Sequence, residues 1–411
     1  MKGIKKAPIK GGILLIVSSL AAFLASALFS IILTQELYGK ITTLFSIASI
    51  LIVISPIGTN FYFLTNRETF YQYQNSLTTL PVAVVFLLGL PAYFIYPTEL
   101  AIAFNFMAIS GSLSIQGILF SQIEKDSYSA AIYQSNQSLI KFFTALIVLL
   151  LYFSSKKIIQ DERFIAYALI AVCIANIPTL LKIGSTSNGY KRAFDYSFFE
   201  KIGKKQRWQL LSFWFSAILG VSYSLGVVPL TSYAHGFTVA AYLGIYFIFW
   251  SGSNILITAT INNHFWPIAC SEHQSGGITR SLILKSALSS TLISIATGVG
   301  MLSGVYLFSA RIWTNYPDIE NFLYISTLAL MLRPFSAWIG MIFLSIDSRV
   351  IKKAITQLFC TILMSILILK LDISTPYSLA WILVLLETTY LAGYIVSSAG
   401  SMSRLIWKTS R

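Results

Sequence analysis

Long apolar stretches, separated by short polar ones, run through the whole chain. A helix needs roughly 20 apolar residues to cross about 30 Å of hydrocarbon, and twelve stretches reach about that length. The first six are 11–33, 41–63, 77–96, 100–120, 130–153 and 164–183. The second six are 209–230, 237–258, 286–308, 322–346, 354–371 and 377–397. The pattern predicts an all-α integral membrane protein with twelve transmembrane helices.

The composition excludes two other classes of protein. Hydrophobic residues make up 56% of the 411 residues and charged residues only 11%, whereas soluble domains carry about 25% charged residues. Such a chain cannot cover a water-facing surface, so it is neither a soluble enzyme nor a disordered protein. The first apolar stretch is too long for a signal peptide and has no small-residue cleavage site at its end, so we expect it to remain as the first span.

The basic residues predict the orientation. If the N-terminus is cytoplasmic, the inner loops hold 21 Lys and Arg residues and the outer loops hold six. Cytoplasmic loops carry the excess of basic residues, so both termini are expected in the cytoplasm. The net charge of +14 then reflects topology and attraction to anionic lipids at the cytoplasmic face. We expect no nucleic-acid partner.

The longest inner connection, 184–208, divides the spans into two groups of six. It mixes basic and aromatic residues, which is typical of an amphipathic helix on the inner leaflet and equally compatible with a solvated linker. We therefore predict a six-helix bundle over 1–183, a cytoplasmic basic linker over 184–208 and a second six-helix bundle over 209–411. Leu, Thr and Gly recur at matching places in 33–39 and 230–236. A repeat of six spans relates the halves by a pseudo-two-fold axis along the membrane normal.

No catalytic constellation is present in the sequence. It has no Walker A pattern, no GxGxxG, no CxxC, and no metal-ligand spacing among its three histidines. We expect no enzymatic activity, no cofactor and no metal site. Energy for transport would then come from an H⁺ or Na⁺ gradient, the membrane potential or the substrate gradient.

Three charged residues lie inside predicted spans and away from their ends: Lys141, Arg333 and Glu387. Each costs about 2.5–3.5 kcal/mol at mid-span on insertion scales, so each should face protein or water. They are the first candidates for a substrate cavity. The alternatives are that Lys141 snorkels to an interface, and that Glu387 is protonated or forms an ion pair with Arg333.

Polar uncharged residues complete the candidate cavity. Gln134, Asn136 and Gln137 lie in the fifth span, and Asn254 lies in the eighth. Pro334 follows Arg333 directly and is a candidate hinge, because proline removes one helical hydrogen bond and frees a carbonyl. Polar clusters of this kind also serve helix packing, which is the alternative interpretation.

Three short motifs resemble a known family. They are the Leu-Thr-x₃-Tyr-Gly turn that ends at Gly39, the charged stretch 123–128, and the stretch 344–349 with Lys352. Together with twelve spans in two halves, they resemble the polysaccharide (O-antigen) flippases of the multidrug/oligosaccharidyl-lipid/polysaccharide exporter superfamily. The resemblance implies two six-helix bundles in a V around a central cavity. It implies transport of undecaprenyl-pyrophosphate-linked oligosaccharide from the inner to the outer leaflet of the bacterial inner membrane, beside a polysaccharide polymerase and a chain-length regulator.

Some features depart from that superfamily's other members. The first two spans lack the arginines of lipid II flippases, and there are twelve spans rather than fourteen, which argues against a peptidoglycan precursor. Two alternatives stay open. A membrane polysaccharide polymerase or glycosyltransferase would need a longer outer loop or an acidic inner region. A drug/cation antiporter of the same fold would need an acidic site, and only Glu387 qualifies.

Overall fold

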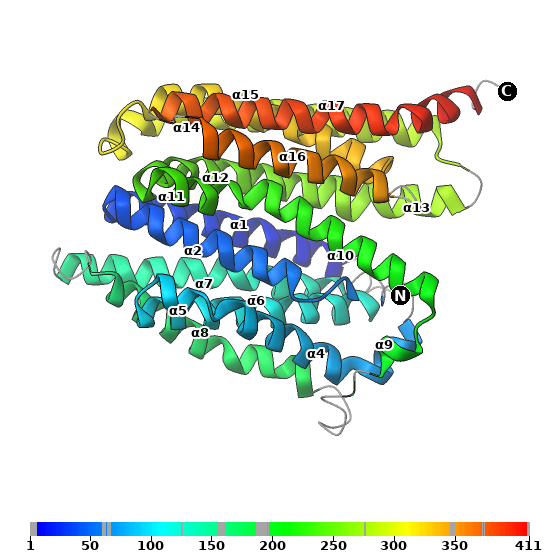
Figure 1. Ribbon diagram of the computed structural model, residues 1–411, viewed down its shortest axis with the longest axis horizontal. Coiled ribbons are helices and arrows are strands. Elements are labelled where there is room, and N and C mark those ends of the chain that lie inside the picture. The colour runs from blue at the N-terminus through cyan, green and yellow to red at the C-terminus, as the bar shows by residue number, and fades with distance from the viewer. Residues whose placement is uncertain are drawn as a thin grey trace. The chain divides into compact units, whose positions relative to one another are not determined.

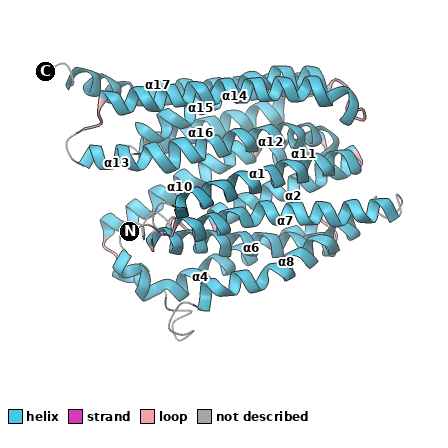
Figure 2. Cartoon of the chain, turned by 180° about the vertical axis from the view of Figure 1, so that it is seen from behind, coloured by secondary structure: helices cyan, strands magenta, loops and turns pink. Residues whose placement is uncertain are grey.

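The computed structural model describes residues 6–59, 63, 67–124, 126–154, 161–185, 195, 197–274, 277–345, 350–371, 373 and 375–408. These residues form helices joined by short loops, and no strand occurs among them (Figure 2). The chain divides into two compact units, Met1–Val221 and Ser222–Arg411, which we call the N-terminal and C-terminal units. The bundle boundaries expected from the sequence remain a prediction.

The predicted membrane character is confirmed by the helices themselves. Nine helices in the described part of the chain are long and apolar enough to cross a membrane, or ten if the pair 206–225 and 227–235, bent by 48°, is one span. Of the remaining predicted spans, 77–96 contains a shorter apolar helical stretch, Thr78–Phe94. The protein is therefore an all-helical integral membrane protein, and the count of twelve spans stays a prediction.

The N-terminal unit is a layered bundle of long helices (Figure 1). Its elements are α1 (Lys6–Ile32), α2 (Gln35–Ile54), α4 (Arg67–Gly89), α5 (Ala92–Ile95), α6 (Thr98–Ile123), α7 (Ser127–Ser154), α8 (Glu162–Ser185), α9 (Phe198–Lys201) and the first part of α10 (Lys204–Leu225). Helix α6 is central and packs against α2, α4, α7 and α8, and α1 lies along α7.

Small residues explain the central place of α6. Its face carries Ser110, Ser112, Ser114 and two glycines, all buried. A Cβ atom at Gly117 would lie 2.6 Å from the ring of Tyr133, and one at Gly111 would lie 2.2 Å from Ile52. Without a hydrophobic driving force between helices in lipid, such close approach provides the packing energy.

Helix α2 begins and ends earlier than the predicted span 41–63. Thr34 accepts a hydrogen bond from the amide of Leu37 and so caps α2 at its N-terminus. Ile57 and Gly58 then take positive φ values of 51° and 73°, which ends the helical path after Ile54. The prediction was wrong here because polar residues at the start of α2 masked a capped helix.

The end of the basic linker packs on the N-terminal unit. Ile202 and Phe199 join a hydrophobic cluster with Phe63, Phe70, Tyr73, Leu119, Ile123 and Leu210. The ammonium of Lys201 donates to the Tyr73 hydroxyl at 2.9 Å, and this hydrogen bond lowers the pKa of that phenol from its ordinary value. Most of the rest of the linker, 186–194 and 196, lies outside the described residues.

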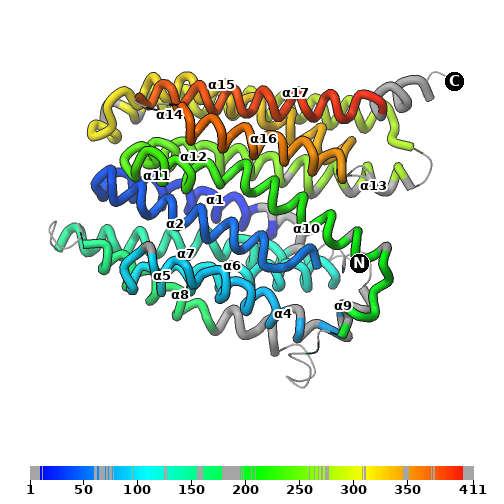
Figure 3. The backbone as a smooth tube through the Cα atoms, in the orientation of Figure 1, coloured from blue at the N-terminus to red at the C-terminus, as the bar shows by residue number. Residues whose placement is uncertain are grey.

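The C-terminal unit contains the longest helices of the chain, which Figure 3 traces back and forth. Its elements are the end of α10, α11 (Val227–His235), α12 (Phe237–Ile257), the π-helix η3 (Thr258–Phe265), α13 (Trp266–Gln274), α14 (Arg280–Ile312), α15 (Ile319–Ile342), α16 (Val350–Lys370) and α17 (Pro376–Lys408). Helix α15 packs most extensively against α14 and α17, and α12 lies against α14 and α15.

The two copies of the sequence repeat adopt different structures. In 33–39 the chain breaks at Thr34, and Gly39 lies inside α2. In 230–236 the helix continues through Thr231, and the break comes at Gly236, whose φ is 86°. The matched letters therefore do not mark equivalent turns.

Candidate functional site

Arg333 and Glu387 form an ion pair inside the C-terminal unit. Arg333 lies on α15 and Glu387 on α17, the two helices that pack most closely there. Nη1 of Arg333 donates to Oε1 of Glu387 at 2.7 Å, and the exposed fractions of the two side chains are 16% and 7%. The structure thus contains the Arg333–Glu387 ion pair, which the sequence offered as an alternative to a substrate-binding role. The pair is neutral as a whole, which lowers the cost of placing its charges in a membrane span.

Aromatic side chains enclose this pair. The guanidinium carbon of Arg333 lies 4.6 Å from the ring centroid of Trp250, within the range of a cation–π contact. Tyr223, Tyr246 and Phe247 line the same small cavity, whose volume is about 20 Å³. That volume holds about one water molecule. The ring of Tyr223 in turn stacks on Tyr390 at 4.3 Å.

Pro334 leaves α15 continuous but changes its hydrogen bonding. Helix α15 runs from Ile319 to Ile342 with Pro334 inside it. One turn before the proline, the carbonyl of Met331 accepts a hydrogen bond from Ser294 of α14 at 2.7 Å. The carbonyl that Pro334 leaves without its helical donor is that of Leu330, four residues earlier, so the hydrogen bond from Ser294 links α14 to α15 and does not replace the one that the proline removes. The hinge role of Pro334 remains a prediction.

Asn254 lies on α12 one turn after Trp250, and its side chain is half-buried. Residues four apart share a helix face, so Asn254 continues the face that Trp250 presents to the ion pair. Its neighbour Ser253 is buried and accepts from Thr297 of α14 at 3.3 Å.

Lys141 is the candidate cation of the N-terminal unit. It lies within α7, and its ammonium nitrogen is 4.8 Å from the ring centroid of Phe45 on α2. Within the described residues, no carboxylate lies within ion-pair distance of it. Gln134 and Gln137 precede it by seven and four residues and share its helix face. Gln134 is exposed, and Gln137 is half-buried.

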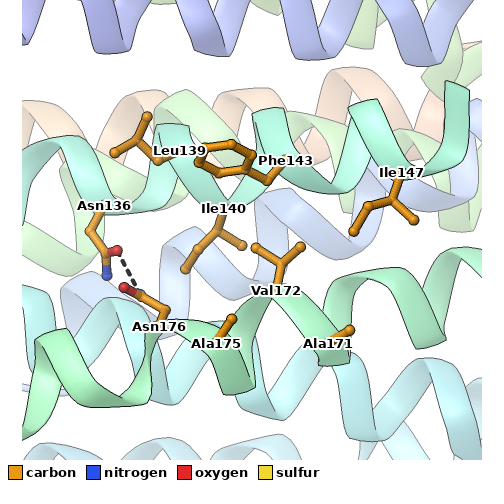
Figure 4. Close-up of a pocket in the computed structure, with 9 residues that line it drawn as sticks. All are labelled: Asn136, Leu139, Ile140, Phe143, Ile147, Ala171, Val172, Ala175 and Asn176. Atoms are coloured by element: carbon orange, nitrogen blue, oxygen red, sulfur yellow. Dashed lines mark hydrogen bonds between the residues drawn. The ribbon is translucent and has the colours of Figure 1, made fainter. Parts of the chain in front are cut away.

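Asn136 points to the other side of α7. At about 3.6 residues per turn, a residue two positions after Gln134 lies nearly opposite to it. Asn136 donates to Ser114 at 2.6 Å and accepts from Asn176 of α8 at 2.6 Å. Asn136 and Asn176 lie at one end of an apolar groove of about 460 Å³ between α7 and α8 (Figure 4). The structure therefore separates Asn136 from the other candidates on its helix.

Several residues of these clusters were not among the candidates predicted from the sequence. Asn176 is the single asparagine of its predicted span, and that isolation was a usable signal. Trp250, Tyr223 and Tyr390 carried no signal, because aromatic residues are common throughout the chain. In the part of the chain that the structure describes, no group of three or more His, Cys, Asp or Glu residues could hold a metal ion.

No protein-family model matches the sequence, and no curated protein matches it. Solved structures match over nearly the whole chain. The structure of the lipid II flippase MurJ in an inward closed conformation is 13% identical, with a TM-score of 0.59, over 95% of this chain and 87% of that chain. An outward-facing multidrug resistance MATE family transporter is 13% identical, with a TM-score of 0.57, over 98% and 96%. A transporter from Pyrococcus furiosus, described as having a binding pocket of reverse polarity, is 12% identical, with a TM-score of 0.52, over 98% and 96%.

The second and third of these proteins are described as transporters of the MOP superfamily, and the first is described as a lipid II flippase. Their identities to this chain, 12% and 13%, are too low to transfer a substrate. The chain therefore shares the fold of these three proteins.

Proposed function

We propose that this protein is a flippase for undecaprenyl-pyrophosphate-linked oligosaccharide. It moves the repeat unit of an O-antigen or capsule from the inner to the outer leaflet of the bacterial inner membrane by alternating access. The fold supports transport in general, since a lipid II flippase and multidrug transporters share it. The choice of an anionic lipid-linked substrate needs a separate observation.

That observation is the unpaired charge of Lys141. Arg333 and Glu387 neutralise each other in the C-terminal unit, whereas the described residues provide no carboxylate for Lys141. A cation inside a span costs about 2.5–3.5 kcal/mol, and an anionic head group would offset that cost during transport. Amide groups on the same face of α7, at Gln134 and Gln137, suit the hydroxyls of a sugar.

The same charges argue against a drug cation as substrate. A site for cations needs an available carboxylate, and Glu387 is already bound by Arg333 at 2.7 Å. Export of lipid-linked sugar would further imply anionic lipids at the cytoplasmic face, a polysaccharide polymerase and a chain-length regulator as partners, and an H⁺ or Na⁺ gradient as the energy source.

Replacement of Lys141 tests the proposal in cells. Lys141→Met should abolish surface polysaccharide while lipid-linked repeat units accumulate on the inner leaflet, as in a clean deletion. Lys141→Arg should retain part of the export, because the charge is kept. Lys370→Met, at the exposed end of α16, is the matched control and should export normally. Normal surface polysaccharide with Lys141→Met at wild-type abundance would contradict the role of Lys141, and normal polysaccharide in the deletion strain would contradict the function.

The orientation is tested by cysteine labelling. In a variant without Cys173, Cys270 and Cys360, an impermeant reagent should reach Thr98→Cys and Asn315→Cys from the periplasm, since both positions are exposed. It should not reach Lys204→Cys. The reverse pattern would place the termini outside the cytoplasm.

A further inference from the structure

The ion pair uses only part of the hydrogen-bonding capacity of its two members. A guanidinium has five N–H donors and binds a carboxylate best through two parallel hydrogen bonds. Here the two residues share a single hydrogen bond, from Nη1 of Arg333 to Oε1 of Glu387, and the Tyr223 hydroxyl interacts with the same carboxylate. The second carboxylate oxygen, Oε2, is buried and accepts no hydrogen bond from the described residues. The pair is therefore less stable than a bidentate one, although both side chains are held inside the unit.

Among the described residues around this cavity, Glu387 provides the only carboxylate. The titratable and charged groups that face it are Arg333 from α15, Tyr223 from α10, Tyr246 from α12, Cys360 from α16, and Tyr390 on α17 itself. Arginine stays charged in proteins, and neutral tyrosine and cysteine have no site for a further proton at ordinary pH. A proton that reaches the cavity therefore binds to the Glu387 carboxylate.

The cavity beside the pair is too small for an external anion in this structure. Its volume of about 20 Å³ suits one water molecule. Trp250 covers one face of the guanidinium, and the Glu387 carboxylate binds its edge. The carboxylate thus occupies the place where a phosphate group would bind Arg333 through its planar fork.

We propose that Glu387 acts as an exchangeable internal anion, whose protonation releases Arg333 to bind the phosphate of the transported lipid. This inference rests on the proposed function. One proton from water adds to the Glu387 carboxylate, the ion pair breaks, and the freed guanidinium binds one phosphate group. When the phosphate leaves, Glu387 gives the proton back to water and the ion pair forms again. Without proton uptake, a phosphate and a carboxylate would compete for one guanidinium and repel each other.

Anion binding and proton binding are then linked. A ligand that binds only when Glu387 is protonated takes up one proton, so its affinity weakens about tenfold for each pH unit above the pKa of that carboxyl group. Glu387→Gln imitates the protonated acid. In this variant Arg333 is free at every pH, and the linked proton disappears.

The test measures binding of inorganic pyrophosphate to the purified full-length protein at several pH values. Pyrophosphate itself titrates, so the informative quantity is the difference between variants. For each unit by which the pH rises, the affinity of the wild-type protein for pyrophosphate should fall about tenfold more than that of Glu387→Gln. At pH 8, Glu387→Gln should therefore bind pyrophosphate at least tenfold more tightly than the wild type. Glu320→Gln, another carboxylate of the same unit that accepts from Ser309, is the control and should match the wild type. Arg333→Met should lose pyrophosphate binding, both alone and combined with Glu387→Gln.

A second measurement detects the proton on the carboxyl group of the wild-type protein, with Glu387→Gln as its control. Infrared difference spectra of the wild-type protein should show the C=O band of a protonated carboxylic acid when pyrophosphate is added, and the band should be absent in Glu387→Gln. Pyrophosphate binding with the same pH dependence in both proteins, or with no such band, would overturn this inference and leave the proposed function standing. Absence of any pyrophosphate binding would overturn this inference and also count against an anionic lipid as substrate.

Discussion

Between α6, α7 and α8, the N-terminal unit buries a network of neutral hydrogen bonds, whereas between α15 and α17 the C-terminal unit buries two opposite charges. In the first, Asn136 and Asn176 form hydrogen bonds with each other and with Ser110 and Ser114 of α6. In the second, Arg333 and Glu387 face each other among aromatic rings. Neutral groups can be removed one at a time at small cost, but a charge that loses its partner stays buried and unpaired.

This difference assigns separate tasks to the two units. The neutral network is fully formed and belongs to packing, because each amide hydrogen bond lies between helices of one bundle. The ion pair is incomplete and can change with protonation. Lys141 lies on the opposite face of α7 from Asn136, and its charge belongs to neither arrangement.

The largest expected effect comes from breaking the ion pair. Arg333→Ala leaves Glu387 buried without its counter-charge, and loss of one partner of a buried pair costs about 3–5 kcal/mol. Thermal unfolding in detergent should show a large loss of stability, which the double change Arg333→Ala with Glu387→Gln should restore. Arg280→Ala, at the exposed start of α14, serves as the control.

Export by the same variants separates stability from substrate binding. If Arg333 binds substrate, the double variant regains abundance but not export, and Arg333→Lys retains part of the export. If the double variant regains both, Arg333 serves only to neutralise Glu387.

A smaller effect is expected in the neutral network. Asn136→Ala removes its hydrogen bonds to Ser114, Ser110 and Asn176. Interhelical hydrogen bonds in membranes average about 0.6 kcal/mol and reach about 1.7 kcal/mol, so the loss should be about 1–2 kcal/mol. Gln134→Ala, at an exposed position of the same helix, should change the unfolding free energy little. A loss as large as that of Arg333→Ala would erase the contrast between the two units.

The smallest effect concerns a single hydrogen bond between α14 and α15. Ser294→Ala removes the hydrogen bond to the Met331 carbonyl and should cost about 0.6 kcal/mol. Ser290, one turn earlier on α14, is buried, and its hydroxyl makes no hydrogen bond to the described residues. Ser290→Ala is therefore the matched control and should be neutral or slightly stabilising. Equal effects of both changes in the unfolding free energy would remove the special role of Ser294.

Hydropathy predicted the helical class because a long apolar stretch in a membrane must satisfy its backbone hydrogen bonds within itself, and the α-helix does so. The α2 boundaries were missed because a side-chain cap at Thr34 and two positive φ values decide them. The Arg333–Glu387 pair was among the alternatives because only one carboxylate lies in a predicted span. The separation of Asn136 from Gln134 follows from helical periodicity and was available in the sequence. The aromatic residues around the ion pair could not be predicted from the sequence, because their position depends on how α10, α12 and α17 pack.

Translocation by the purified protein tests the account most directly. In proteoliposomes that contain a fluorescent undecaprenyl-pyrophosphate-linked oligosaccharide, the wild-type protein should move the labelled lipid between leaflets, as detected by an enzyme or quencher that reaches only the outer leaflet. Lys141→Met should fall to the rate of protein-free vesicles, whereas Lys370→Met should match the wild type. A wild-type rate no higher than that of protein-free vesicles, with uptake of a cationic drug by the same vesicles, would contradict the account.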